Sequence, residues 1–201
     1  TRLQGDWSSD VCSSDLTVEI GGRLVTRETL EIGFASFSGA DEHFISTSAA
    51  LRRHGVPVHM IRPMVLGDCV RDWSIEAAES AFVPYDDQQS LIPLEPESAW
   101  QRWLWPSRAA LEGIVSFGGK TQKDLGAAWW GWYRWVGERY EIPLTITFGE
   151  VATHNHFVLD RGGKVFNRTA PVIKLPAGAS EDEHLGLLGL LNSSVACFWL
   201  K

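Results

Sequence analysis

Residues 144–175 read LTITFGEVATHNHFVLDRGGKVFNRTAPVIKL and contain three short runs of apolar and β-branched residues. The runs are 144–148, 157–159 and 172–175, and the turn sequence Asp-Arg-Gly-Gly at 160–163 ends the second of them. Runs of this length and composition, separated by Gly, Asn and Pro, are typical of β-strands. This part of the chain therefore predicts a group of short strands.

The helix expected after these strands has the clearest signals in the chain. Ser180 and Glu183 have the spacing of a capping box, and acidic residues occupy the first turn. We expect the core face of this helix to be filled by its leucines, which are Leu185, Leu187, Leu188, Leu190 and Leu191.

The upstream chain mixes helical and extended patterns. Residues 97–112 carry Trp and Leu at helical spacing, and a helix capped by Asp41 or Ser46 is expected to end at Gly55. Further strands are expected at 32–37, 58–65 and 82–85. The sequence thus predicts an α+β fold of mixed short strands, peripheral helices and a C-terminal leucine-rich helix.

The composition is that of a globular protein of 201 residues, with 44% hydrophobic and 21% charged residues. No apolar run of membrane-spanning length and no signal peptide is found, so we expect a cytoplasmic protein that does not contact membranes. The three cysteines, Cys12, Cys69 and Cys197, are far apart and odd in number, which favours free thiols.

Both ends of the chain look like cuts. Residues 1–16 read TRLQGDWSSDVCSSDL, and 6–15 match the translation of a common sequencing adapter. At the other end, 195–201 is apolar and stops without a helix cap. We therefore expect 1–16 to be a non-native scar, and 17–201 to be one domain truncated at both ends.

Two kinds of enzyme site are disfavoured. His154 and His156 would share one face of a strand, but no Cys or carboxylate at ligand spacing accompanies them, so no metal site is predicted. A Gly-x-Ser-x-Gly elbow is absent, which disfavours a hydrolase.

Charge is segregated along the chain, although its sum of -7 is unusual for a nucleic-acid-binding module. Basic residues gather in 52–62 and 161–174, and acidic residues in 76–97 and 181–183. The basic turn at 160–164, preceded by 154–156, could place donors against bases and phosphates. A solvated hairpin with scattered charges is an equally open interpretation.

The chain has 10 tryptophans, far above the usual number. Aromatic rings can stack on exposed bases, but in a run such as WWGWYRW at 129–135 we expect most of them in the core.

The order of motifs along 30–201 resembles the PglX family, the adenine-specific methyltransferases of BREX (Pgl-type) phage-defence systems. The motifs include IRPMVLGDCVRDW at 61–73 and LLGLLNSS at 187–194. The most specific are VATHNHFVLDRGGKVF at 151–166 and APVIKLP at 170–176. The resemblance implies N6-adenine methylation of host DNA at a non-palindromic site, with S-adenosylmethionine, as a self mark in prokaryotes.

The resemblance implies the C-terminal target-recognition (specificity) domain of a single-chain adenine DNA methyltransferase. Methyl transfer to adenine needs a tetrapeptide of the Asn/Asp/Ser-Pro-Pro-Tyr kind, and Val83-Pro84-Tyr85 lacks its polar head and second proline. A glycine-rich cofactor motif is missing too. We expect no catalytic and no cofactor-binding residues here, and S-adenosylmethionine only in the full-length protein.

The expected partners are double-stranded DNA, the missing catalytic domain and other phage-defence subunits. The alternative is a protein-interaction module of a defence complex without DNA readout. The candidate DNA-binding residues are Arg62, Arg71, Lys120, His154, Asn155, His156, Arg161, Lys164 and Arg168.

Overall fold

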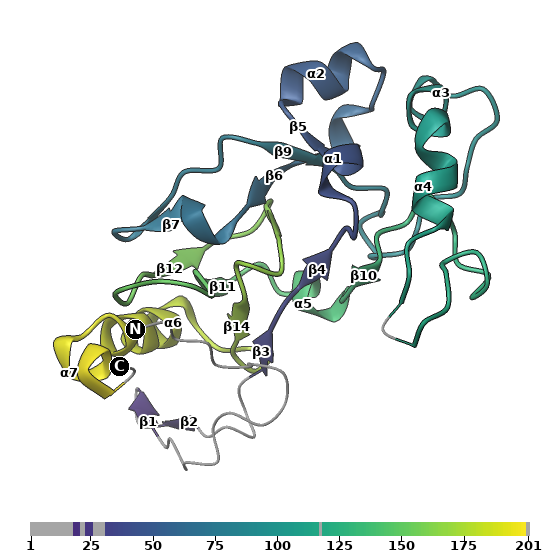
Figure 1. Ribbon diagram of the computed structural model, residues 1–201. Helices are drawn as coiled ribbons and strands as arrows, with labels where there is room; N and C mark the ends of the chain where they lie inside the picture. Colours follow the sequence, from purple (N-terminus) through teal and green to yellow (C-terminus); the bar gives the residue numbers. More distant parts are fainter. Residues whose placement is uncertain (1–17, 21–22, 26–30, 117, 200–201) are drawn as a thin grey trace.

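The computed structural model describes residues 18–20, 23–25, 31–116 and 118–199 (Figure 1). Residues 1–16, expected to be a scar, lie outside the described residues. The described part is a mixed fold of many short strands and few helices, as predicted. None of the helices in this part is long and apolar enough to span a membrane.

The three runs of 144–175 are strands, as predicted, and the structure places them in one antiparallel sheet. Its strands are β11 (Thr145–Phe148), β12 (Phe157–Asp160), β14 (Val172–Lys174) and β3 (Glu31–Gly33), in the order β12-β11-β14-β3. One face buries an apolar cluster that includes Ile146, Phe148, Phe157, Leu159 and Ile173.

Helix α6 (Glu181–Leu191) packs on this cluster beside β12 (Figure 1). The predicted capping box is confirmed: the Ser180 hydroxyl accepts from the Glu183 N–H, and the Glu183 carboxylate accepts from the Ser180 N–H at 2.7 Å. Not all the leucines are buried, however. Leu187 and Leu188 are, whereas Leu185 and Leu190 are 43% and 39% exposed, because only one stripe of the helix meets the sheet. Helix α7 (Ser194–Trp199) follows.

A second sheet brings distant parts of the chain together. Its order is β13-β6-β9-β5, from β13 (Val165–Phe166), β6 (Ile61–Val65), β9 (Ser80–Phe82) and β5 (Ile45–Ser46). Strand β13 is parallel to β6, and the other pairs are antiparallel.

The turn between β12 and β13 is therefore not a hairpin, because these two strands belong to different sheets. Gly162 and Gly163 have φ of +103° and +82°, a region that favours glycine. A Cβ on Gly162 would also stand 3.0 Å from Cβ of Pro143. The two glycines thus allow the backbone conformation with which the chain passes from the sheet of β12 to the sheet of β13.

Two predicted helices differ in detail. The helix expected at 97–112 is α3 (Ala99–Leu104), a 3-10 turn (Trp105–Ser107) and α4 (Arg108–Glu112), and the interruption contains Pro106, which has no N–H to donate. The predicted cap at Asp41 or Ser46 was wrong. Asp41 begins the short α1 (Asp41–Phe44), and Thr47 caps α2 (Ser48–Arg53).

The predicted strands also end differently. Residues 32–37 split between β3 and β4 (Ser36–Phe37), which lie in different sheets, and 58–60 form a 3-10 turn before β6. Strand β9 ends at Phe82, and Tyr85 forms an isolated bridge with Leu91. The remaining elements are β1 (Val18–Ile20), β2 (Arg23–Val25), β7 (Val70–Arg71), β8 (Ser74–Ile75), β10 (Arg134–Trp135), α5 (Glu138–Glu141) and a 3-10 turn at Gly67–Cys69.

Most tryptophans with described side chains belong to the core, as expected. Trp100, Trp129 and Trp132 are buried, and Trp103, Trp130 and Trp135 are partly buried against the same cluster. Trp73 and Trp105 are 60% and 50% exposed.

Candidate nucleic-acid interface

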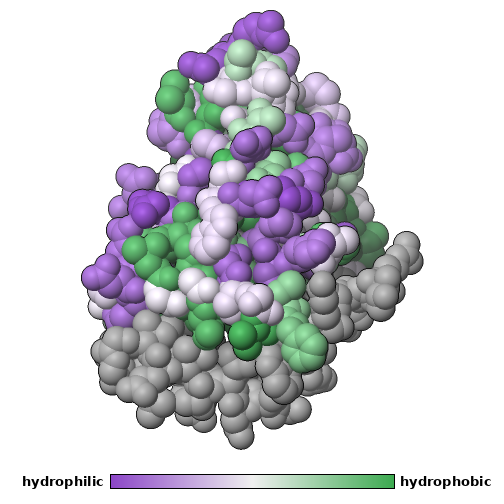
Figure 2. All heavy atoms as spheres, turned by 90° about the vertical axis from the view of Figure 1, so that its left-hand side faces the viewer, coloured by the Kyte–Doolittle hydropathy of each residue, from purple (hydrophilic) through white to green (hydrophobic). Residues whose placement is uncertain are grey.

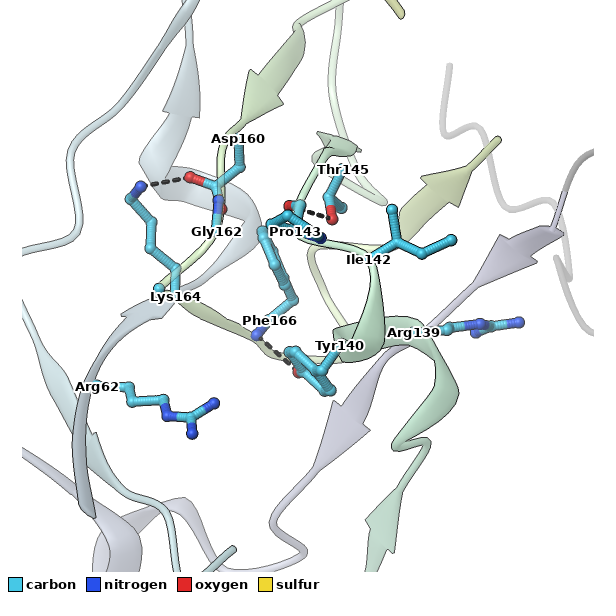
Figure 3. A pocket seen from close by; sticks show the side chains of 11 residues that line it. Arg62, Arg139, Tyr140, Ile142, Pro143, Thr145, Asp160, Gly162, Lys164 and Phe166 are labelled. Atoms are coloured by element: carbon cyan, nitrogen blue, oxygen red, sulfur yellow. Dashed lines mark hydrogen bonds and ion pairs between the residues drawn. The ribbon is translucent and has the colours of Figure 1, made fainter. Parts of the chain in front are cut away.

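A cavity of about 70 Å³ lies between β6, α5 and the turn that joins β12 to β13 (Figure 3). Its walls come from segments that are far apart in the sequence, and they meet because β13 pairs with β6. The polar side chains of the lining are Arg62, Arg139, Tyr140, Thr145, Asp160 and Lys164.

The single carboxylate of the lining is already compensated. Asp160 is 3% exposed, and it forms an ion pair with the Lys164 ammonium group. Its second oxygen accepts a hydrogen bond of 3.0 Å from the Gly162 N–H. Figure 3 shows Lys164 turned toward Asp160. Lys164 therefore neutralises Asp160 and holds the turn.

Among the described residues, Arg62 is the cation of this cavity that has no hydrogen-bond or ion-pair partner. It lies on β6 and is half-buried, and no described residue forms a hydrogen bond or an ion pair with its guanidinium group. Figure 3 shows this group reaching from β6 toward Tyr140. Arg139 extends away from the Asp160–Lys164 pair and donates to the Phe34 carbonyl. Burial lowers the pKa of Arg139.

Tyr140 holds the wall formed by α5. Its hydroxyl lies 2.9 Å from Oγ of Ser36 and accepts a 3.2 Å hydrogen bond from the Phe166 N–H. Burial raises the pKa of Tyr140 to about 12, although the Phe166 N–H and the Ser36 hydroxyl favour the ionised form. The ring therefore stays neutral at ordinary pH, and it ties α5 to β4 and β13.

The loop 151–156 differs from its prediction. His154 and His156 precede β12 in a loop, so they do not share a strand face. The Asn155 side chain donates to the Leu191 carbonyl at 2.8 Å, and His156 Nδ1 accepts a long 3.4 Å bond from the Asp72 N–H. Asn155 thus fastens the loop to α6, and His154, which is exposed, remains available to a ligand.

The other predicted cations are exposed but scattered. Arg71 donates to the carbonyls of Gly67 and Val70, at 3.1 and 2.7 Å. Arg161 pairs with Glu181 at 2.6 Å. Lys120 lies in the turn closed by the Val115–Thr121 bridge, next to α4 and apart from the rest. The structure thus brings Arg62 and Lys164 together, and Arg71 lies near His156 through Asp72.

A basic and aromatic patch surrounds Phe37. The Arg168 guanidinium lies 5.1 Å from the Phe37 ring, and the Arg134 guanidinium lies 5.8 Å from the Tyr133 ring. The two rings meet edge to face at 5.6 Å. Sequence reasoning named Arg168 but missed Arg134, because the β4–β10 pairing that brings them together joins residues about a hundred positions apart.

Trp73 was also missed. It lies at the tip of the β7–β8 turn, where Asp72 and Trp73 have φ of 46° and 70°. Such values are unusual for residues other than glycine and occur at functional sites more often than elsewhere. The acidic residues of this region, Asp68, Asp72 and Glu76, are exposed, so this tip does not present a basic surface.

The side of the molecule with β7 and β12 carries no uniform surface. Figure 2 shows hydrophilic and apolar side chains interspersed over this face. Among the residues described, no group of three His, Cys, Asp or Glu side chains could hold a metal ion. The arrangement at the cavity can bind an anion, since no described carboxylate pairs with Arg62.

No family model matches the chain. A curated protein of Streptomyces coelicolor, named adenine-specific methyltransferase PglX, is 44% identical to it over 178 residues, 89% of this chain. The chain is similar to a segment of PglX. The predicted resemblance to the PglX family is thus confirmed, while the chain spans only about 15% of the length of PglX.

The match to PglX includes the cavity. The match covers 178 of the 201 residues, so 23 residues at the two ends together lie outside it. Wherever the matched segment begins, it therefore contains residues 24–178. Arg62, the 151–156 loop and the 160–164 turn therefore all lie in the part that is similar to PglX.

Proposed function

We propose that this chain is the DNA-recognition portion of a site-specific N6-adenine DNA methyltransferase in a BREX-like phage-defence system. The observation that carries the proposal is the 44% identity to PglX, whose name gives its activity as adenine-specific methylation. The sequence has neither the adenine-binding tetrapeptide nor a glycine-rich cofactor motif. We therefore assign S-adenosylmethionine and methyl transfer to the rest of a longer protein, and DNA contact to this chain.

The cations around the cavity and the Phe37 patch support DNA as the partner. Arg62, Arg134 and Arg168 lie on strands and turns without a carboxylate paired to any of them among the described residues. In protein–DNA complexes such cations position the phosphate backbone, and polar side chains such as His154 read base edges. An acidic total charge is compatible with this role when a second, tethered domain also grips the DNA.

The alternative is a protein-interaction module that docks on another defence subunit. Such a surface needs clustered exposed aromatic residues. Trp73 and Trp105 are the described tryptophans with half or more of their surface exposed, and they lie on separate parts of the fold, the β7–β8 turn and the break between α3 and α4. This separation favours the DNA proposal.

Sequencing the gene beyond both ends of this chain tests the methyltransferase assignment. We expect an upstream Asn-Pro-Pro-Tyr-type motif and a glycine-rich cofactor strand in the same reading frame. A continuous frame with neither motif would contradict the proposal and favour the interaction module.

DNA binding is tested by fluorescence anisotropy of a labelled duplex over a salt series. We expect affinity to fall with salt, and Arg161→Ala combined with Arg168→Ala to weaken binding and to lower the slope of log K against log salt by about 2. Both side chains are exposed, so their removal leaves no buried carboxylate without a partner. Lys164→Ala is avoided because it would leave the buried Asp160 carboxylate unpaired.

The matched control is Arg102→Ala, an exposed arginine on α3 that is remote from the cavity. It should leave the slope unchanged. Equal slopes for the double variant and the wild type would contradict the assignment of Arg161 and Arg168, and no salt-dependent binding at all would contradict DNA recognition.

A further inference from the structure

We propose that the cavity between β6, α5 and the 160–164 turn is a phosphate-binding site, and that Arg62 is the main residue that binds the phosphate. The ligand is a tetrahedral phosphate group, either a phosphodiester of DNA or free phosphate. The assignment of the phosphate group to DNA rests on the proposed function, whereas the existence of a phosphate-binding site does not depend on it.

The size of the cavity selects a small ligand. A water molecule needs roughly 10–15 Å³ measured in this way, so 70 Å³ holds about five to seven water-sized positions. A phosphate group has five heavy atoms, which matches this space. A nucleobase or a cofactor such as S-adenosylmethionine needs a pocket of several hundred Å³, on the order of 300 or more. The cavity therefore fits a small polyatomic group.

The charge of the cavity selects an anion. Three cationic residues line it, Arg62, Arg139 and Lys164, against the single carboxylate of Asp160 among the described residues, and the Arg139 guanidinium group is turned away toward the Phe34 carbonyl (Figure 3). Lys164 neutralises that carboxylate and the Gly162 N–H donates to it, so no described residue compensates the Arg62 charge. A half-buried charge without a partner is costly, and an oxyanion would relieve this cost through paired N–H···O bonds to the planar guanidinium group.

The turn leaves its backbone open to such a ligand. Gly163 lines the cavity, and apart from Gly163 itself and its two chain neighbours no described atom lies within 4 Å of the place where its Cβ would stand. Gly162, by contrast, packs against Pro143 and fixes the turn. A glycine that both lines a cavity and has free space around it allows a ligand to approach the main chain closely.

The first experiment measures thermal unfolding of the chain in sodium phosphate and in sodium chloride of equal ionic strength. We expect phosphate to raise Tm of the wild type by about 2–4 °C relative to Arg62→Gln. Arg62 forms no hydrogen bond or ion pair with a described residue, so Arg62→Gln should fold. Arg102→Gln is the matched control and should keep the wild-type response.

Phosphate also stabilises proteins in general, through exclusion from their surface. The difference between the wild type and Arg62→Gln is therefore the decisive quantity. An equal rise in both, or no rise in the wild type, would overturn the site.

Anisotropy with a labelled duplex distinguishes the two sources. If the ligand is a DNA phosphodiester, Arg62→Gln should weaken binding about tenfold and lower the salt slope by about 1. If Arg62→Gln abolishes the phosphate response but leaves DNA affinity unchanged, the site holds free phosphate. An Arg62-dependent phosphate response in a chain that binds no DNA would support the site and contradict the proposed function.

Discussion

Lys174 is a buried cation held by neutral oxygen atoms. Its side chain is on β14 and 4% exposed, and its ammonium group donates to the Ile142 and Leu144 carbonyls and to the Thr145 hydroxyl. Burial is the main cause that lowers the pKa of Lys174 from 10.5 to about 8, and nearby Arg139 lowers it further while Asp160 opposes the shift. The residue thus fixes the segment that leads from the cavity into β11.

This environment predicts a pH dependence of stability. Between about pH 8 and about pH 10.5 the unfolded chain binds more of the Lys174 proton than the folded chain, so the free energy of unfolding should rise with pH. Below about pH 8 both states are protonated and this contribution is flat. Urea unfolding over this range measures it, with Lys174→Met as the comparison. A slope in the variant equal to that of the wild type would refute the assignment to Lys174.

Helix α6 shows how one element is defined by its own residues. The Ser180–Glu183 capping box starts it, and the buried positions His184, Leu187 and Leu188 have helical spacing. The sequence located this helix correctly because capping is a contact between residues three positions apart. It did not reveal that Leu185 and Leu190 face solvent, because that depends on where β12 lies.

The cap should contribute measurably to stability. Ser180→Ala removes the oxygen that accepts from the Glu183 N–H, so the free energy of unfolding should fall by about 1 kcal/mol. Ser180→Thr retains a hydroxyl and should lose only a fraction of this. Urea unfolding of the three proteins decides the matter, and equal losses in both variants would contradict a capping role.

At the scale of the whole molecule, a row of aromatic rings connects two separate parts of the core. Tyr85 stacks on Trp135 with centroids 4.2 Å apart, Trp135 on Tyr140 at 4.5 Å, and Tyr140 on Phe166 at 6.4 Å. Tyr85 belongs to the cluster around Phe44 and Trp132, and Phe166 to the cluster that includes Val65 and Val158. The row therefore couples regions that lie far apart in the sequence.

Trp135 is the central ring of this row and the natural place to interrupt it. Trp135→Ala removes stacking on both sides and leaves a cavity, so the free energy of unfolding should fall by about 3 kcal/mol. Trp135→Phe keeps a ring and should cost less than half of this. Far-UV circular dichroism during urea unfolding measures both, and a loss below about 1 kcal/mol for Trp135→Ala would mean that the row does not couple the clusters.

The sequence by itself determined the local features: the strands near 145–148, 157–160 and 172–174, the turn at 160–163 and the capped helix at 181–191. Each depends on residue types within a few positions, through backbone preferences, turn glycines and caps. The sequence also indicated that most tryptophans are buried, since large apolar rings dominate burial.

Only the tertiary structure decided which candidate residues meet. Lys164 lies at the same cavity as Arg62 because β13 pairs with β6, about a hundred residues away, and nothing local specifies that partner. Tertiary packing also decided the other candidates. The Asn155 side chain bonds to α6 and Arg161 pairs with Glu181, whereas Lys120 lies in a separate turn. Pairing between distant strands depends on the shape and burial of whole surfaces, so the candidate side chains could be listed from the sequence, but their assembly into a site could not.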